Sequence, residues 1–376
     1  MNFAERIIRT FEHKSLDKIV WQPRFAYWFD HYARHATEEN FDEYKQYMPK
    51  RYIGMESLEI YDDLNASIRY CGETLKLPLF NKRNKKDAEI RRRTKTLDDG
   101  SIYREIITPE GTVSQTSRNG YTHDHLVKKI EDLEVIKYIV SQEEYEFNQV
   151  GYELAKEVMY PDYGLPTSYY FRSPYMRCVL EFMGFEKTII FLRRYEREME
   201  DLFQFLEQWD LKQYENVICK SPLKWVNFGE NIDQNLVPPH YFEKYLMEYY
   251  HSRCKLLDRE GKYTFIHIDG SFKDLLPLIP ELPHDGIEAL TPPPQGDVTV
   301  KEMYDAIYDS GKIFIDILPA TLFMDKFEEE KLRKKTEEIL ELLSPNLILG
   351  ISDELCMGDG SRLKMVSEVV ENFEPH

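Results

Sequence analysis

The stretch Tyr263-Thr-Phe-Ile-His-Ile-Asp-Gly270 is a short apolar run that ends in a histidine and an aspartate. Its apolar residues predict a buried strand, and residues two apart on a strand point the same way. His267 and Asp269 should therefore leave the strand side by side, and Gly270 allows the chain to turn sharply after them. A histidine and a carboxylate at the carboxyl end of a strand are a common start for a metal site or an acid/base site.

The sequence around this run repeats the same alternation of short apolar runs and amphipathic segments. Predicted strands cover residues 224–230, 263–267, 286–290, 312–318 and 346–351, and predicted helices cover 239–260, 272–278, 300–309 and 326–343, with a last helix from Gly360. This alternation is typical of a parallel sheet. No Gly-x-Gly-x-x-Gly motif follows any of these strands, so the α/β fold expected is a (β/α)8 TIM barrel rather than a dinucleotide-binding sheet.

The first half of the chain adds two further strands and an elaboration. Strands are predicted at residues 18–23 and 165–170, and helices at 130–142 and 144–158. Between them, residues 88–117 alternate around turn signals and predict an antiparallel hairpin inserted near the barrel mouth. No stretch has linker composition, so residues 1–376 are expected to form a single barrel domain with an N-terminal helical and β-hairpin elaboration.

Composition narrows the classes of partner. The formal net charge of −18 argues against nucleic acid and anionic membranes, which need a basic surface. No apolar run reaches the 18 residues of a membrane span, and the start of the chain has no apolar signal core, so a cytoplasmic protein is expected. The five cysteines are scattered and odd in number, which indicates reduced thiols rather than disulfides.

Titratable residues gather where the predicted strands end. They are Glu230, His267, Asp269, Glu288 and Asp316, followed by Asp353 and Cys356 in the loop after the last strand. Each also has a purely structural interpretation: a hydrogen-bonded core histidine, a helix-capping carboxylate, or a small buried thiol. Together, Glu230, His267, Asp269 and Cys356 supply N, O and S donors from three strand ends, which suits an open catalytic zinc site, with Glu230 and Asp269 also the candidate catalytic carboxylates.

Several segments resemble the uroporphyrinogen decarboxylase fold family. The resemblance runs over nearly the whole chain. It rests on Glu5-Arg6, residues 11–21, Thr108-Pro-Glu-Gly-Thr112, residues 125–134, Val237-Pro-Pro-His-Tyr-Phe242, and Ile287-Glu-Ala-Leu through Gly296-Asp. It implies the same (β/α)8 barrel. The decarboxylases proper bind substrate carboxylates through an arginine-rich segment near the N-terminus, whereas the corresponding residues 21–28 here contain the single Arg24.

The closer resemblance is to the cobalamin-dependent methyltransferase branch of this family, which holds zinc with a His-x-Cys pair and a later cysteine. His267 matches the histidine and Cys356 the later cysteine, while Asp269 stands in the place of the first cysteine and Glu230 falls where a carboxylate could complete the ligand set. A carboxylate in place of a thiolate makes the zinc harder, which favours oxygen over a thiol.

The resemblance thus implies transfer of a methyl group between a small methylated substrate and the cobalamin of a separate corrinoid protein. An aryl methyl ether, undergoing O-demethylation, is the substrate class that fits a harder zinc, and Tyr27, Trp28 and Phe29 are candidates to line its pocket. Three alternatives stay open: a decarboxylase, which would need a strongly basic mouth; a glycosidase that uses Glu230 and Glu288; and a barrel that binds a corrinoid without catalysis.

Overall fold

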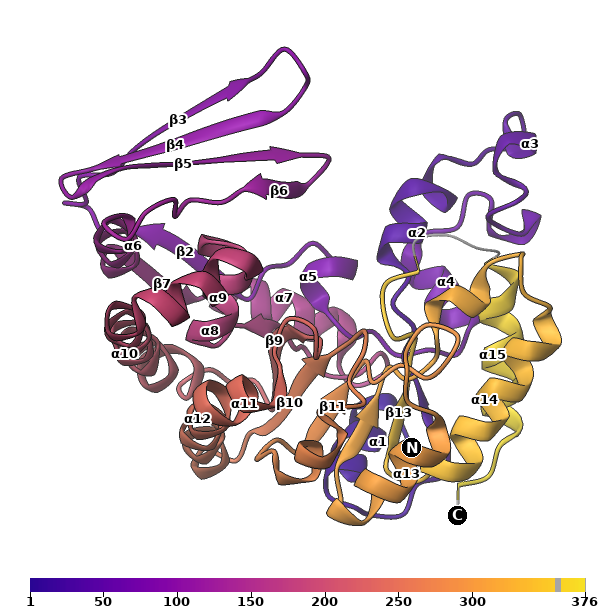
Figure 1. The fold of residues 1–376 in the computed structure, drawn as a ribbon. Coiled ribbons are helices and arrows are strands. Elements are labelled where there is room, and N and C mark those ends of the chain that lie inside the picture. Colours follow the sequence, from indigo (N-terminus) through magenta and orange to yellow (C-terminus); the bar gives the residue numbers. More distant parts are fainter. Residues whose placement is uncertain (356–359, 376) are drawn as a thin grey trace.

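A computed structural model describes residues 1–355 and 360–375, and its centre is a parallel sheet of seven strands (Figure 1). The order across the sheet is β1-β13-β12-β11-β10-β9-β8. The strands are β1 (Val20–Trp21), β8 (Tyr169–Tyr170), β9 (Trp225–Ile232), β10 (Tyr263–Ile268), β11 (Gly286–Glu288), β12 (Ile313–Ile315) and β13 (Leu347–Leu349). All seven strand runs predicted from the apolar pattern are confirmed, although most are shorter than predicted.

Residues 67 and 68 bridge the two edges of this sheet. The Ser67 amide donates to the Trp21 carbonyl at 2.8 Å, and the Ile68 amide donates to the Tyr163 carbonyl, also at 2.8 Å. The segment therefore occupies the gap between β1 and the residues leading into β8. No strand was predicted for this segment, because it contains no apolar run, and it forms only isolated hydrogen bonds to the two edges of the sheet.

The space enclosed by the strands is filled in two layers. An apolar layer at the amino end of the strands includes Val20, Trp225 and Phe265, and helix α1 (Phe3–Phe11) packs against it. Above this layer, toward the carboxyl ends, the side chains are polar and buried. Stacking of the Phe11 ring on Tyr263 at 5.0 Å shows how α1 covers the amino end.

Helices cover the outer face of the sheet; those after residue 238 lie in amphipathic segments predicted from the sequence, whereas those between residues 174 and 213 were not predicted. They are α8 (Pro174–Arg177), α9 (Phe185–Arg194), α10 (Glu196–Gln213), α11 (Pro239–Tyr241), α12 (Glu248–Arg259), α13 (Val300–Ile307), α14 (Glu329–Leu343) and α15 (Ser361–Asn372). Short π-helical turns lengthen α8, α10 and α11 (Cys178–Phe182, Tyr214–Ile218 and Phe242–Met247), and 3-10 turns cover Leu276–Glu281, Tyr308–Ser310 and Ala320–Phe323. No helix in the described part of the chain is long and apolar enough to span a bilayer.

Two extra parts rise beyond the carboxyl ends of the strands (Figure 1). The first follows β1 and contains α2 (Ala26–His31), α3 (Phe41–Tyr44) and α4 (Ser57–Asp63), with 3-10 turns at Ala33–His35 and Lys50–Tyr52. The second contains α5 (Cys71–Thr74), β2 (Phe80–Asn84), β3 (Arg91–Thr96), β4 (Ile102–Thr108), β5 (Gly111–Arg118), β6 (Tyr121–Asp124), α6 (Asp132–Ser141), β7 (Glu143–Phe147) and α7 (Gln149–Met159).

Three predictions are corrected, two of them in the second part. The insertion at residues 88–117 is larger than a hairpin, because β3–β6 form a four-stranded antiparallel sheet that ends at Asp124. The helix predicted over 144–158 begins only at Gln149, because residues 143–147 pair with β2 instead. In the main sheet region, the helix predicted over 272–278 is replaced by the 3-10 turn Leu276–Glu281, whose Pro277 and Pro280 cannot donate α-helical hydrogen bonds.

Candidate functional site

His267 and Glu288 face each other inside the curved sheet, at the carboxyl end of their strands. The two residues are register partners on β10 and β11. Nδ1 of His267 lies 2.8 Å from Oε2 of Glu288, and both residues are buried. The hydrogen bond therefore fixes the plane of the imidazole ring.

Asp269 lies on the other side of the same ring, as the i, i+2 spacing predicts. Its Oδ2 is 3.7 Å from Nε2 of His267, and its side chain is 39% exposed, so this side of the ring faces the mouth. Gly270 turns the chain with φ +61°, and a Cβ there would clash with the Asp233 carboxylate. Burial lowers the pKa of His267, but the Asp269 and Glu288 carboxylates outweigh burial and raise it to about 10.

Glu230 lies on the neighbouring strand but turns the other way. Along β9, Asn227 bonds to Glu288 inside the sheet, whereas Phe228 packs against Tyr250 outside it. By strand alternation Glu230 shares the outer face with Phe228. Its Oε1 accepts from the Ser173 amide at 2.7 Å and its Oε2 from the Ser173 hydroxyl at 3.0 Å. Burial raises the pKa of this carboxyl to about 8. The structure thus brings His267 and Asp269 together and directs Glu230 to Ser173.

Cys356, the fourth candidate ligand, lies outside the described residues. The chain immediately before it is held at the mouth, because the Leu355 amide donates to the Arg24 carbonyl at 2.9 Å. The Tyr27 amide in turn donates to Oε2 of Glu354 at 2.8 Å. Within residues 1–355 and 360–375, no group of three or more His, Cys, Asp or Glu side chains is arranged to hold a metal ion. The His267–Asp269 pair offers one nitrogen and one carboxylate, which suits an incomplete zinc site.

A polar layer around Arg69 supports the pair from below, and no strand was predicted for the segment that carries Arg69. The Arg69 guanidinium bridges Oε1 of Glu288 at 3.1 Å and Oδ1 of Asp316 at 2.8 Å, with all three side chains buried. Burial and the Glu288 charge raise the pKa of Asp316 to about 7. Although burial opposes it, the contacts with His267 and Arg69 hold the pKa of Glu288 well below its usual range. The position of Asp316 at a strand end was predicted, but its arginine partner was not.

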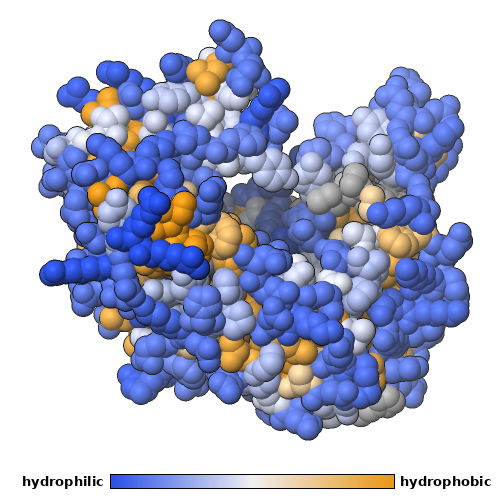
Figure 2. Space-filling model, in the orientation of Figure 1, coloured by the Kyte–Doolittle hydropathy of each residue, from blue (hydrophilic) through white to orange (hydrophobic). Residues whose placement is uncertain are grey.

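The mouth above these residues opens into a hollow. Figure 2 shows it on the face between the part built from β3–β6 and the part built from α2–α4. At the mouth Arg24 binds Glu73 at 2.9 Å, and its guanidinium lies 5.2 Å from the centre of the Tyr70 ring. The Tyr70 ring stacks on Tyr169 at 4.1 Å.

The aromatic residues predicted to line a pocket separate into two groups. Trp28 and Phe29 are buried in the core of the α2–α4 part, where the Trp28 indole donates to the Tyr47 carbonyl at 2.7 Å. Tyr27 is 44% exposed and stacks on His31. Of these three rings, only Tyr27 is exposed enough to meet a ligand in the hollow.

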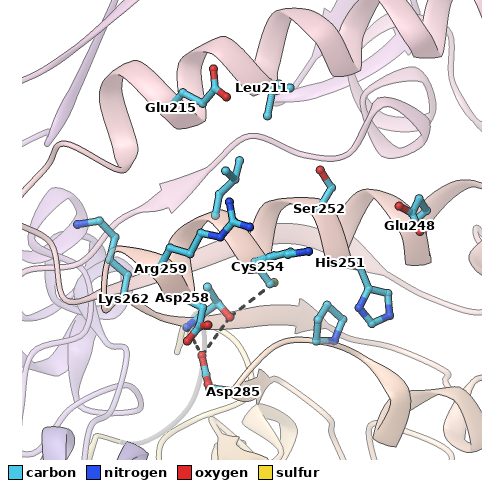
Figure 3. Close-up of a pocket in the computed structure, with 14 residues that line it drawn as sticks. Leu211, Glu215, Glu248, His251, Ser252, Cys254, Asp258, Arg259, Lys262 and Asp285 are labelled. Atoms are coloured by element: carbon cyan, nitrogen blue, oxygen red, sulfur yellow. Dashed lines mark hydrogen bonds between the residues drawn. The ribbon is translucent and has the colours of Figure 1, made fainter.

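A separate groove of about 790 Å³ lies on the outer side of the sheet (Figure 3). Leu211 and Glu215 line one wall, and residues of helix α12, among them Cys254, line the other. Asp285, at the groove's inner edge, accepts from the Thr264 amide at 2.7 Å. Thr264 is near the amino end of β10, so this groove is at the end of the strand away from His267 and Asp269.

Comparisons with known proteins bear on the fold. No protein-family model matches the chain, and no curated protein matches it either. Among solved structures the chain is similar to a methyltransferase from Methanosarcina mazei, with a TM-score of 0.57 and 11% sequence identity. The match covers 99% of each chain, so the similarity extends over the extra parts as well as the sheet.

Proposed function

We propose that this chain is a zinc-dependent methyltransferase that moves a methyl group between a small methylated substrate and the cobalamin of a separate corrinoid protein. The observation that carries the proposal is the His267–Asp269 pair, 3.7 Å apart at the carboxyl end of β10. The whole-length similarity to a solved methyltransferase supports it. We infer that the seven strands and residues 67–68 form a (β/α)8-type barrel of the uroporphyrinogen decarboxylase fold family, in which such strand ends carry the active site.

The proposed zinc ligands are Nε2 of His267, the Asp269 carboxylate and the Cys356 thiolate. The two described ligands fit this role, because a zinc-bound histidine usually has its other nitrogen tied to a carboxylate, as His267 is to Glu288. Glu230 is the proposed fourth ligand, but it faces the outer side of the sheet, so the end of β9 would have to rearrange and its hydrogen bonds with Ser173 would have to break before it reached the metal. When bound, zinc would supply positive charge to stabilise the oxygen that leaves an aryl methyl ether.

The other residues of the mouth position the substrate and limit water. The partly exposed Tyr169 stacks on the buried Tyr70 ring beside Arg24, and Tyr27 adds an exposed ring. The hollow seen in Figure 2 gives the partner protein a way to bring its cobalamin to the strand ends. The cobalamin belongs to the partner as the methyl acceptor or donor, so the chain itself needs only to orient the methyl group toward it.

Charge at the mouth disfavours the decarboxylase alternative. A substrate with several carboxylates needs unpaired arginines, yet Arg24 is bound to Glu73 and Arg69 to Glu288 and Asp316. The glycosidase alternative is also weakened, because Glu230 and Glu288 point to opposite faces of the sheet. A barrel that binds a corrinoid without catalysis remains a second candidate, since it would use the same hollow.

Methyl transfer to free reduced cobalamin tests the proposal without the partner. An aryl methyl ether should lose its methyl group only when zinc, protein and reduced cobalamin are all present. The double variant His267→Ala, Cys356→Ala should be inactive, whereas Cys219→Ser, which changes a cysteine far from the mouth, should keep the wild-type rate. Wild-type turnover by the double variant would exclude the zinc mechanism, and cobalamin binding without transfer would favour the non-catalytic alternative.

A further inference from the structure

Glu288 is surrounded by hydrogen-bond donors on both of its carboxylate oxygens. Oε1 accepts from the Tyr70 hydroxyl at 2.7 Å and from Nη1 of Arg69 at 3.1 Å. Oε2 accepts from Nδ2 of Asn227 at 2.7 Å and lies 2.8 Å from Nδ1 of His267. The residue is completely buried, so no water competes for these oxygens.

Arg69 is itself fixed, and it therefore fixes Glu288. Its Nε donates to Gln22, and its Nη2 donates to Asp316 at 2.8 Å. The guanidinium also lies 5.3 Å from the centre of the Trp225 ring, on the apolar layer that fills the amino end of the sheet. Side chains from β9 and β11 and from the ends of β1 and β12 thus meet at one guanidinium, which restrains the Glu288 carboxylate.

The geometry points to a defined role for this carboxylate. A carboxylate that is ionised and bonded to an arginine can only accept hydrogen bonds, so the nitrogen facing it must carry a proton. We propose that Glu288, held by Arg69, is a positioning residue that keeps a proton of His267 on Nδ1, so that Nε2 is the nitrogen that gives up its proton to bind a ligand at the mouth. The identity of that ligand as zinc rests on the proposed function, whereas the placement of the proton does not.

The orientation has a measurable consequence for metal binding. Partners that orient a ligating histidine typically contribute about 10- to 100-fold to metal affinity. Glu288→Gln would keep the shape of the side chain but offer an NH2 group in place of one acceptor oxygen. The amide would compete as a donor toward Nδ1, so His267 would lose its fixed proton position.

The direct test is nitrogen-15 NMR of the ten histidines of the full chain, with the His267 signal assigned from a His267→Gln variant. The wild-type protein near pH 7 should show a proton on Nδ1 of His267, both without metal and after addition of zinc. Glu288→Gln should lose this signature and bind zinc about 10- to 100-fold more weakly. Asp285→Asn is the matched control, because Asp285 accepts from Thr264 at the opposite end of β10 and should leave both readouts unchanged.

The outcomes separate this inference from the proposed function. A bare Nδ1 in the wild-type protein would overturn the inference, and so would unchanged zinc affinity in Glu288→Gln. If Nδ1 carries its proton but the protein binds no zinc, the positioning role stands and the zinc mechanism fails. If Glu288→Gln does not fold, the wild-type spectrum alone decides, and Tyr70→Phe, which removes one donor from Glu288, should weaken zinc binding in the same direction.

Discussion

The imidazole of His267 and the carboxylate of Glu288 form a buried pair, 2.8 Å apart, between register partners of adjacent parallel strands. The two ring nitrogens of the histidine therefore have different surroundings. Nδ1 faces the buried polar layer, and Nε2 faces Asp269 and the mouth. The pairing of β10 with β11 therefore sets the orientation of the His267 ring at the end of β10.

Zinc content is the first expected consequence. Wild-type protein purified without a histidine tag should retain about one zinc per chain. Cys356→Ser and His267→Ala should each lose it, because a site with one donor fewer binds zinc far more weakly. Cys219→Ser serves as the control and should retain the metal. Elemental analysis of the purified proteins measures this, and a metal-free wild type after zinc addition would contradict the assignment.

Glu230 should matter less to zinc than His267 does. Its carboxylate is bonded to Ser173 through both oxygens, so zinc gains Glu230 only by displacing those bonds. Glu230→Gln is expected to weaken zinc binding by a smaller factor than His267→Ala, as measured by competition with a chelator. Ser173→Ala, which removes the hydroxyl bond, should strengthen binding slightly. Equal losses in Glu230→Gln and His267→Ala would instead make Glu230 a primary ligand.

Removing Arg69 should destabilise the whole fold. Its side chain is 1% exposed and links Glu288 to Asp316, so Arg69→Met leaves two buried carboxylates without their cation. Breaking a buried ion pair in this way costs about 3–5 kcal/mol in the free energy of unfolding. Arg333→Met, which removes two surface ion pairs that are each 4.0 Å long, should cost under about 1 kcal/mol. Urea unfolding near pH 7 measures both, and similar costs would contradict the buried network.

The loss of folding stability at acidic pH should depend on His284. This residue is 2% exposed, its ring packs edge-on against Phe228 at 4.6 Å, and neither ring nitrogen has a partner among the described residues. Burial, with a smaller contribution from Lys312, holds its pKa well below the usual value. Unfolded histidine takes up a proton below about pH 6.5, whereas the folded one does not, so stability falls as the pH drops.

His284→Phe should remove this sensitivity, because phenylalanine fits the same aromatic surroundings without a titrating group. The variant and wild type should diverge below about pH 6.5, by up to about 1.4 kcal/mol per pH unit, with the variant the more stable. Urea unfolding at several pH values gives the comparison. His123→Phe, at an exposed position, should run parallel to wild type, and parallel curves for His284→Phe would refute the explanation.

The sequence alone determined the features that depend on local pattern. Short apolar runs such as residues 263–268 became the strands of the parallel sheet, because such runs are stable only when both faces are covered. The i, i+2 spacing of His267 and Asp269 placed them together, because strand side chains alternate. Glu288 and Asp316 were placed at strand ends because each lies at the end of a predicted apolar strand.

Only the tertiary structure decided which strand-end residues meet. The apolar runs of β9 and β10 end near Glu230 and His267, respectively. Glu230 nevertheless faces outward and accepts a hydrogen bond from Ser173, because neighbouring positions of a strand point to opposite faces of the sheet. Arg69 comes from a segment without strand pattern, and it reaches the site because residues 67–68 bridge β1 and the chain before β8. Residues 143–147 became a strand because β2 was available to pair with them. Pairing of this kind joins chain segments that are far apart in the sequence, so a local sequence pattern cannot predict it.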